Sequence, residues 1–197
     1  MAALADRVRA MIAQPAQEWP VIAAESGSIT DVLRGYVVPL ALIGPVLSLA
    51  GAVIFSHEPV LVAMTAAVLE FILEIVAVFV VAFIAAAVAP SFGGTADRLA
   101  AFKWVAYSST ARFVAGIFLV LPVFGRLIVL VASLYSLYTL YLGTVPVMRV
   151  ATEKAAGFTI VVVLVYIVAI AIVTFLVTAL LALFFASAAI ATGGFAR

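Results

Sequence analysis

Three charged side chains lie within long apolar stretches of the sequence, namely Glu70, Glu74 and Arg112. Glu70 and Glu74 are four residues apart, so a helix presents both carboxyl groups on one face. A charged side chain that faces lipid costs about 3 kcal/mol on insertion scales, so we expect all three to face protein or water. Two close carboxylates repel each other, and a shared proton, the Arg112 guanidinium or a bound metal ion would each relieve the repulsion.

This grouping supports two interpretations. It suits a pathway for a cation, a proton or a small solute, with Glu70 and Glu74 at the site and Arg112 as their counter-ion. It also suits an internal salt bridge that fixes the register of neighbouring helices. The second carboxylate, which a single arginine leaves without a partner, favours the pathway.

The depths of the three charges predict which of them form a pair. Glu70 lies about 16 Å of helix rise from Pro59, at the end of its stretch that the charge count below assigns to the outer side. Arg112 lies about 14 Å from Leu121, which is also at an outer end. Antiparallel neighbours would bring Arg112 level with Glu70 and place Glu74 one turn deeper. We therefore predict an Arg112–Glu70 pair and an adjustable proton on Glu74.

Hydroxyl groups in the next two apolar stretches extend this candidate pathway. They belong to Tyr107 and Ser108 in one stretch and to Tyr135 and Tyr138 in the other. Such groups hydrogen-bond between membrane helices, which is their commoner role, and they also line wet cavities. We include these four residues in the candidate pathway beside Arg112.

No sequence motif of an enzyme or a cofactor site is present. The chain has no cysteine, and its one histidine, His57, stands beside Glu58 in a short expected loop. The motifs of metalloproteases, nucleotide-binding P-loops and serine hydrolases are missing. We expect a non-enzyme without a cofactor, in which Glu70 and Glu74 are possible metal ligands, while His57 and Glu58 are adjacent candidate ligands that better suit a solvated loop. The net charge of +1 excludes a basic surface for nucleic acids.

The composition indicates an all-helical membrane bundle that positions these charges. The 197 residues are 68% hydrophobic and 10% charged, whereas soluble domains carry about 25% charged residues. Stretches long enough to cross a bilayer about 30 Å thick predict five membrane helices. We place them at residues 35–55, 59–89, 104–121, 127–147 and 158–190, followed by an outer tail at 191–197.

The distribution of basic residues predicts the orientation of these helices. With the N-terminus inside, seven basic residues lie in inner segments: Arg7, Arg9, Arg34, Arg98, Lys103, Arg149 and Lys154. Two lie in outer segments: Arg126 and Arg197. This excess favours an inside N-terminus and an outside C-terminus. We expect a protein of the bacterial cytoplasmic membrane.

Residues 1–34 predict a short amphipathic helix and an interfacial segment ahead of the first span. Arg7, Arg9 and Trp19 suit an anchor at the membrane–water interface, which orients the first span. The alternative is a surface helix that docks a partner or senses lipid.

Two local signals shape the start of the first span. Ser28 and Asp31 have the spacing of a capping box, in which each side chain satisfies the backbone of the other. Pro39 and Pro45 interrupt the helix, because each removes a backbone hydrogen bond and bends the chain.

Several of these stretches together resemble the Yip family, the five-span Ypt/Rab-interacting membrane proteins, in its short bacterial form. The residues that carry the resemblance are Arg7-Val8-Arg9 through Pro15, Glu18-Trp19, Ile22-Ala23-Ala24-Glu25, Tyr36-Val37-Val38-Pro39, Phe102-Lys103-Trp104-Val105-Ala106-Tyr107-Ser108 to Leu121-Pro122, Tyr135–Gly143 and Glu153-Lys154-Ala155. The resemblance implies five helices with a cytoplasmic N-terminus, as the charge count does.

Departures from the family limit what the resemblance implies. Eukaryotic relatives are associated with membrane trafficking, small-GTPase contacts and membrane shaping. Here their long cytoplasmic region is missing, and of their Asp-Leu-Tyr-Gly-Pro signature only Gly35-Tyr36 and Pro39 remain. Ala111 stands where the bacterial pattern has a proline. GTPase binding is therefore not carried over.

Two functions follow as alternatives. The first is a transporter or channel that uses the buried Glu/Glu/Arg group. The second is a non-enzymatic membrane organiser, which oligomerises and docks partners through residues 1–34 while the charged group is purely structural. Both place the chain in a lipid bilayer, and we expect homo-oligomers.

Overall fold

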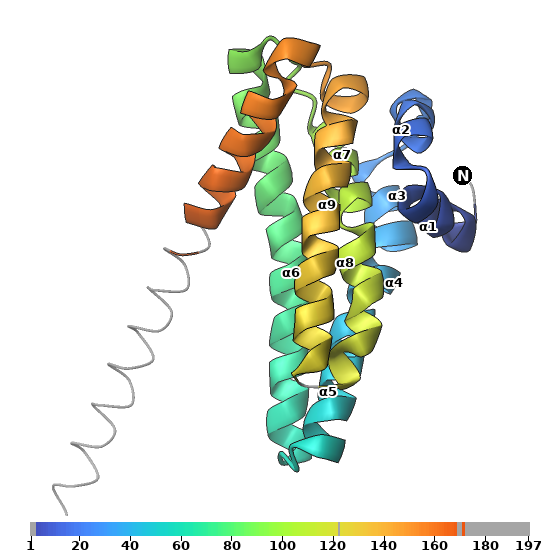
Figure 1. The fold of residues 1–197 in the computed structure, drawn as a ribbon, viewed down its shortest axis with the longest axis vertical. Coiled ribbons are helices and arrows are strands. Elements are labelled where there is room, and N and C mark those ends of the chain that lie inside the picture. Colours follow the sequence, from blue (N-terminus) through green and yellow to red (C-terminus); the bar gives the residue numbers. More distant parts are fainter. Residues whose placement is uncertain (1–2, 122, 169–170, 172–197) are drawn as a thin grey trace, which may run out of the picture. The chain divides into compact units, whose positions relative to one another are not determined.

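The computed structural model describes residues 3–121, 123–168 and 171, and within them the chain is helical and without strands. It divides into two compact units, Met1–Val162 and Val163–Arg197. The first unit carries all the labelled helices (Figure 1) and ends in a helical segment over residues 152–162. In the second unit, residues 163–168 are helical.

Within the part of the chain that the structure describes, three helical stretches are long and apolar enough to cross a membrane: Ile29–Phe55, Val60–Phe92 and Phe124–Met148. They are made of α3 (Ile29–Val32), η1 (Leu33–Val37), α4 (Val38–Ala41) and α5 (Ile43–Phe55), then α6 (Val60–Val88) with η2 (Ala89–Phe92), and α9 (Phe124–Met148). They correspond to the first, second and fourth predicted spans, and the first of them begins six residues earlier than predicted. The protein is thus an all-helical membrane protein.

The third predicted span, 104–121, is built differently. It divides into α7 (Arg98–Ser108), α8 (Thr110–Ala115) and the 3-10 turns of η3 (Gly116–Val120). Helix α7 contacts both α6 and α9, and all of its residues from Ala101 to Ser108 are buried. The fifth predicted span, 158–190, and the tail, 191–197, lie mostly outside the described residues. Five spans and their orientation therefore stay predictions.

The outward faces of the long helices suit lipid contact. Leu61 and Phe83 of α6 are 76% and 67% exposed, and Val131 of α9 is 67% exposed. Side chains of this kind would be costly to expose to water over so large a surface, whereas hydrocarbon accepts them. This pattern agrees with membrane insertion.

The first span is interrupted close to the two prolines, as predicted. A π-helical turn, η1, precedes Pro39, and the α-helix is interrupted again at Leu42 before α5 begins. Beyond the break, a Cβ atom on Gly116 would lie 2.8 Å from the Cα atom of Gly44. The two glycines therefore allow the backbones of α5 and η3 to touch.

The N-terminal helices α1 (Leu4–Ala13) and α2 (Pro15–Ala24) pack onto this bundle, with α1 contacting α8 and α2 contacting α9. The predicted capping box at the start of α3 is confirmed. The Asp31 backbone N–H donates to Ser28 Oγ at 3.1 Å, and the Ser28 backbone N–H donates to Asp31 Oδ2 at 3.0 Å. The turn that links α2 to the first span is therefore fixed by its own side chains.

Candidate functional site

The intramembrane cluster, which we define as Glu70, Glu74 and Arg112, is brought together by α6 and α8. Arg112 Nη1 donates to Glu74 Oε1 at 2.7 Å, and the side chains are 29% and 18% exposed. Glu74 occupies the middle of α6, so this ion pair lies deep within the second candidate span. A charge-assisted bond at this depth ties α8 to α6.

The predicted pairing of Arg112 with Glu70 is wrong. The prediction counted the depth of Arg112 from Leu121 with the rise of a regular α-helix. Residues Gly116–Val120 instead form 3-10 turns, which rise about 2.0 Å per residue rather than about 1.5 Å. Arg112 therefore lies deeper than counted, and it meets Glu74 instead of Glu70.

Glu70 has a different environment from Glu74, although both project from the same face of α6. It is half-buried and forms no ion pair with any residue in the described part of the chain. Its polar neighbour is the Ser48 side chain of α5. The single guanidinium of the cluster thus compensates the charge of Glu74 and leaves Glu70 without an ion-pair partner in the cluster.

A second hydroxyl group lies beside the cluster, and it belongs to a residue outside the four hydroxyls of the predicted pathway. The Arg112 backbone N–H donates to Ser136 Oγ of α9 at 3.3 Å. Ser136 stands between Tyr135 and Tyr138 in the same hydroxyl-rich stretch. That stretch was the only sequence signal for it.

The four predicted pathway hydroxyls lie elsewhere. Tyr135 donates to the Ile12 carbonyl of α1 at 2.7 Å, and Tyr138 is 53% exposed. Ser108 donates to the Val105 carbonyl within its own helix at 2.9 Å. Tyr107 is buried beneath the N-terminal helices, as described below.

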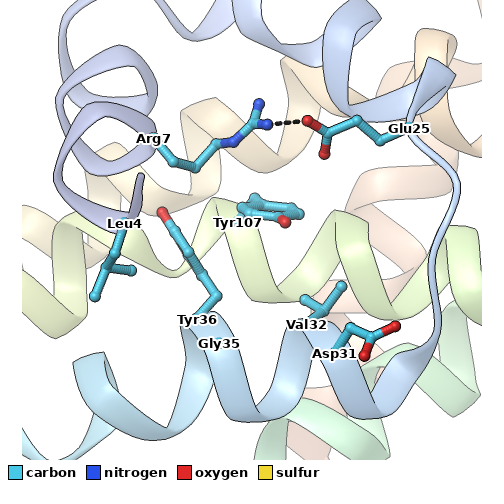
Figure 2. A pocket seen from close by; sticks show the side chains of 8 residues that line it. All are labelled: Leu4, Arg7, Glu25, Asp31, Val32, Gly35, Tyr36 and Tyr107. Carbon is cyan, nitrogen blue, oxygen red and sulfur yellow. Dashed lines mark hydrogen bonds and ion pairs between the residues drawn. The ribbon is translucent and has the colours of Figure 1, made fainter. Parts of the chain in front are cut away.

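A second charged group, the N-terminal ion network, consists of Arg7, Glu18 and Glu25. The Arg7 guanidinium donates through Nη1 to Glu18 and through Nη2 to Glu25, and the arginine is 4% exposed. Figure 2 shows Arg7 directed at Glu25, with the ring of Tyr107 close by, and the guanidinium carbon lies 5.6 Å from that ring's centroid. The network joins α1, α2 and the loop after α2 around one cation.

This arrangement differs from the interfacial anchor that the sequence predicted. Arg7 is enclosed by protein rather than directed at lipid headgroups. Arg9 is exposed on α1, and its role at an interface stays a prediction. The anchoring residue of the segment is Trp19, in a manner that the sequence did not indicate.

Trp19 is fully buried between α2 and α9. Its Nε1 donates to the Thr139 carbonyl at 2.9 Å. A Cβ atom on Gly143 would lie 2.6 Å from Trp19 Cε2 and 2.9 Å from Trp104 Cδ1. Gly143 is therefore the position that lets two indole rings pack on α9, and Trp104 completes the site by donating to the Leu140 carbonyl at 2.7 Å.

A small cavity of about 40 Å³ lies under the ion network. Figure 2 shows its lining side chains, which include Arg7, Tyr36 and Tyr107. The rings of Tyr36 and Tyr107 pack at an interplanar angle of 55° with centroids 4.5 Å apart, and the Tyr36 hydroxyl shares a hydrogen bond of 2.7 Å with Thr110 Oγ1. The cavity has room for only a few water molecules. The contacts around it are those of a packed interface between helices rather than of a ligand site.

The described residues contain no group of three histidine, cysteine or acidic side chains that could hold a metal ion. At the intramembrane cluster, the position beside Glu74 is already taken by a guanidinium group. The donor set there suits a proton or a weakly held cation better than a tightly bound metal ion.

Comparison with known proteins supplies one match. No curated protein and no solved structure matches the chain. A family model described as the Yip1 domain matches residues 9–173, which include α2 to α9 and the intramembrane cluster. Because this match covers well over half of the sequence, the protein is a member of the Yip1 domain family.

Proposed function

We propose that this Yip1-domain membrane protein conducts a proton, a cation or a small solute through the intramembrane cluster, with Glu70 as the exchanging group. One observation carries the proposal. Arg112 is bonded to Glu74, and Glu70, one helical turn away, has no cationic partner among the described residues. A half-buried carboxyl group in a membrane span is costly to keep ionised, so it takes up a proton or binds a cation.

The balance of charge explains how the pair would work. Two ionised carboxylates beside one guanidinium leave one negative charge within the span. A single proton or monovalent cation at Glu70 removes that charge, and its departure restores it. The Arg112–Glu74 bond keeps the second carboxylate occupied, so that the exchange involves one site rather than two.

The surrounding helices offer polar contacts beside this site. Ser48 of α5 neighbours Glu70, and Ser136 of α9 contacts the backbone of Arg112. Both belong to candidate spans. We place the protein in the bacterial cytoplasmic membrane with five spans and the N-terminus inside, so that Glu70 lies on the outer side of Glu74.

The test is flux into liposomes that contain the purified chain. We expect the wild type to carry protons or cations down an imposed gradient, and Glu70→Gln to abolish the flux while folding normally. The matched control is Glu58→Gln, which removes a carboxylate from the exposed loop before α6. This control should retain the wild-type rate.

Two results would contradict the proposal. Equal flux for the wild type and Glu70→Gln would remove Glu70 from the pathway. Wild-type flux no greater than that of empty liposomes, under proton, sodium and potassium gradients, would leave the cluster as a structural tie between α6 and α8.

A second candidate function is a membrane organiser that forms homo-oligomers or docks partners through its N-terminal helices. Ile12 of α1 and Val21 of α2 are 40% and 50% exposed, although both helices are otherwise seated on the bundle. Ile12→Ser with Val21→Ser should weaken crosslinking between copies in native membranes if this surface makes contacts. Unchanged crosslinking would exclude it.

A further inference from the structure

A second cavity, of about 130 Å³, opens where α2, α7 and the end of α9 meet. Two basic side chains line it, Lys103 and Arg149, and so do two acidic ones, Glu25 and Asp97. Pro146 and Val147 of the last turn of α9 complete one wall. Because α9 is a candidate span, the cavity lies at the level where a span meets water and lipid headgroups.

The two acidic groups of this cavity are already engaged. Glu25 accepts a hydrogen bond from Arg7 in the N-terminal ion network. Asp97 caps α7, because its Oδ1 accepts from the backbone N–H groups of Leu99 at 2.9 Å and Ala100 at 3.0 Å. Both carboxylates therefore already accept hydrogen bonds from donors of the protein itself, which partly neutralise their charge.

The two basic groups are not matched by carboxylates. Lys103 is 5% exposed, and its ammonium group donates to the carbonyls of Ile22, at 3.2 Å, and of Glu25. Within residues 3–121 and 123–168, neither Lys103 nor Arg149 forms an ion pair. An ammonium group has three N–H donors, so one remains beyond the two carbonyl contacts.

Arg149 occupies a backbone position that normally favours glycine. It ends α9 with φ 55° and ψ 29°, the left-handed conformation of a helix C-cap. Glycine adopts this conformation without steric cost, whereas a side chain with a Cβ atom does not. Arg149 is exposed, and it lines the cavity from this position.

We propose that this cavity binds an anionic phosphoryl group, with Lys103 and Arg149 as its charge partners. A buried ammonium and a guanidinium without carboxylate partners are the groups that hold phosphate oxygens in proteins. A volume of about 130 Å³ exceeds what one water needs by roughly tenfold, so the five heavy atoms of a phosphoryl group fit. Its two sources are the headgroup of an anionic phospholipid and free phosphate.

The decisive variant is Arg149→Gly, because it removes the guanidinium group and relieves the left-handed backbone strain together. It should therefore fold at least as well as the wild type, unlike Lys103→Met, which disturbs a buried contact. The matched control is Arg126→Gln, which removes an exposed arginine near the opposite end of the same helix. Asp97→Asn keeps a capping oxygen and removes a negative charge from the cavity.

The measurement is native mass spectrometry of the full chain in detergent, titrated with phosphatidylglycerol and with phosphatidylcholine as the zwitterionic comparison. We expect Arg149→Gly to weaken retention of phosphatidylglycerol about fivefold relative to the wild type. Arg126→Gln should match the wild type, and Asp97→Asn should bind more tightly. Equal retention by the wild type and Arg149→Gly, or equal losses in Arg149→Gly and Arg126→Gln, would overturn the proposal.

Competition with inorganic phosphate distinguishes the two sources. Displacement of phosphatidylglycerol by millimolar phosphate, in the wild type and not in Arg149→Gly, assigns the cavity to phosphoryl groups from either source. Retention of the lipid against phosphate, together with the Arg149→Gly loss, assigns it to lipid headgroups.

Discussion

One arginine and two glutamates occur together twice in this protein, and the two groups are resolved in opposite ways. In the N-terminal ion network, Arg7 bonds both Glu18 and Glu25. In the intramembrane cluster, Arg112 bonds Glu74 and leaves Glu70 aside. The same three types of side chain thus form a closed group, in which both acids bond the arginine, and an open group, in which one acid does not.

The separation of the carboxylates explains the difference. Glu18 lies within α2 and Glu25 just beyond its end, so the two flank a cation that α1 inserts between them. Glu70 and Glu74 are on consecutive turns of one helix, and the Arg112 side chain of α8 reaches that helix at Glu74. Arg7 therefore contacts acids at two separate points, within α2 and at its C-cap, whereas Arg112 contacts one of two acids on adjacent turns.

Burial agrees with this division of roles. The Arg7 side chain is 5% exposed, while that of Arg112 is 29% exposed. A fully buried cation needs complete compensation, because an uncompensated buried charge costs several kcal/mol. A closed network therefore stabilises the fold, whereas the open cluster leaves one carboxyl group without a cationic partner among the described residues.

The largest expected effect comes from removing the indole that holds the closed network in place. Trp19→Ala should lower the free energy of unfolding by about 3–5 kcal/mol, because it empties a fully buried site against Gly143. Unfolding in detergent, followed by tryptophan-independent circular dichroism, measures the change. Phe124→Ala, at a 69% exposed position, is the control. A loss below about 1 kcal/mol for Trp19→Ala would show that α2 is not anchored through Trp19.

Next in size is the removal of the central cation of the closed network. Arg7→Gln leaves two acids facing each other in a partly buried site, so we expect a loss of about 3 kcal/mol in the free energy of unfolding. Adding Glu18→Gln and Glu25→Gln should restore much of that loss, since the repulsion disappears with the charges. Failure of the triple variant to recover would mean that packing of Arg7 over Tyr107, rather than charge, is what matters.

The long helices and the presence of charged residues in the middle of the spans could be predicted from the sequence. Apolar length indicated α6 and α9, the prolines indicated the break in the first span, and the capping box was readable from Ser28 and Asp31. Each of these signals is local, because it depends on residues within a few turns of one another. Mid-span charges stand out for the same reason.

Contacts between distant segments could not be predicted. The sequence does not distinguish a tryptophan at the membrane interface from one that packs on a distant glycine. The burial of Trp19 against Gly143 was therefore not predicted. The Arg112 partner depended on the 3-10 turns of η3, which no distinct pattern of residues indicated. Division of the third stretch into α7, α8 and η3 was missed because its partners are protein rather than lipid.

A third prediction, of intermediate size, sharpens the contrast within the open cluster. A double-mutant cycle between Arg112→Gln and Glu74→Gln should give a coupling energy of about 0.6–1.7 kcal/mol, the range for hydrogen bonds between membrane helices. The corresponding cycle with Glu70→Gln should give a coupling near zero, because no bond joins Glu70 to Arg112. Equal couplings would show that the arginine alternates between the two acids, so that the cluster is closed after all.

The smallest expected effect on stability belongs to Glu70 itself. Glu70→Gln keeps the shape of the side chain and removes one of two like charges a turn apart, a repulsion worth about 0.2–0.5 kcal/mol on a helix. We therefore expect its free energy of unfolding to stay within about 0.5 kcal/mol of the wild type. Glu74→Gln should lower the free energy of unfolding by more, because it leaves the Arg112 guanidinium without its carboxylate partner. Side-by-side unfolding of the two variants measures this asymmetry. A Glu70→Gln variant as unstable as Glu74→Gln would mean that Glu70 holds the bundle together. The neutral result, combined with lost flux, separates a group kept for exchange from one kept for the fold.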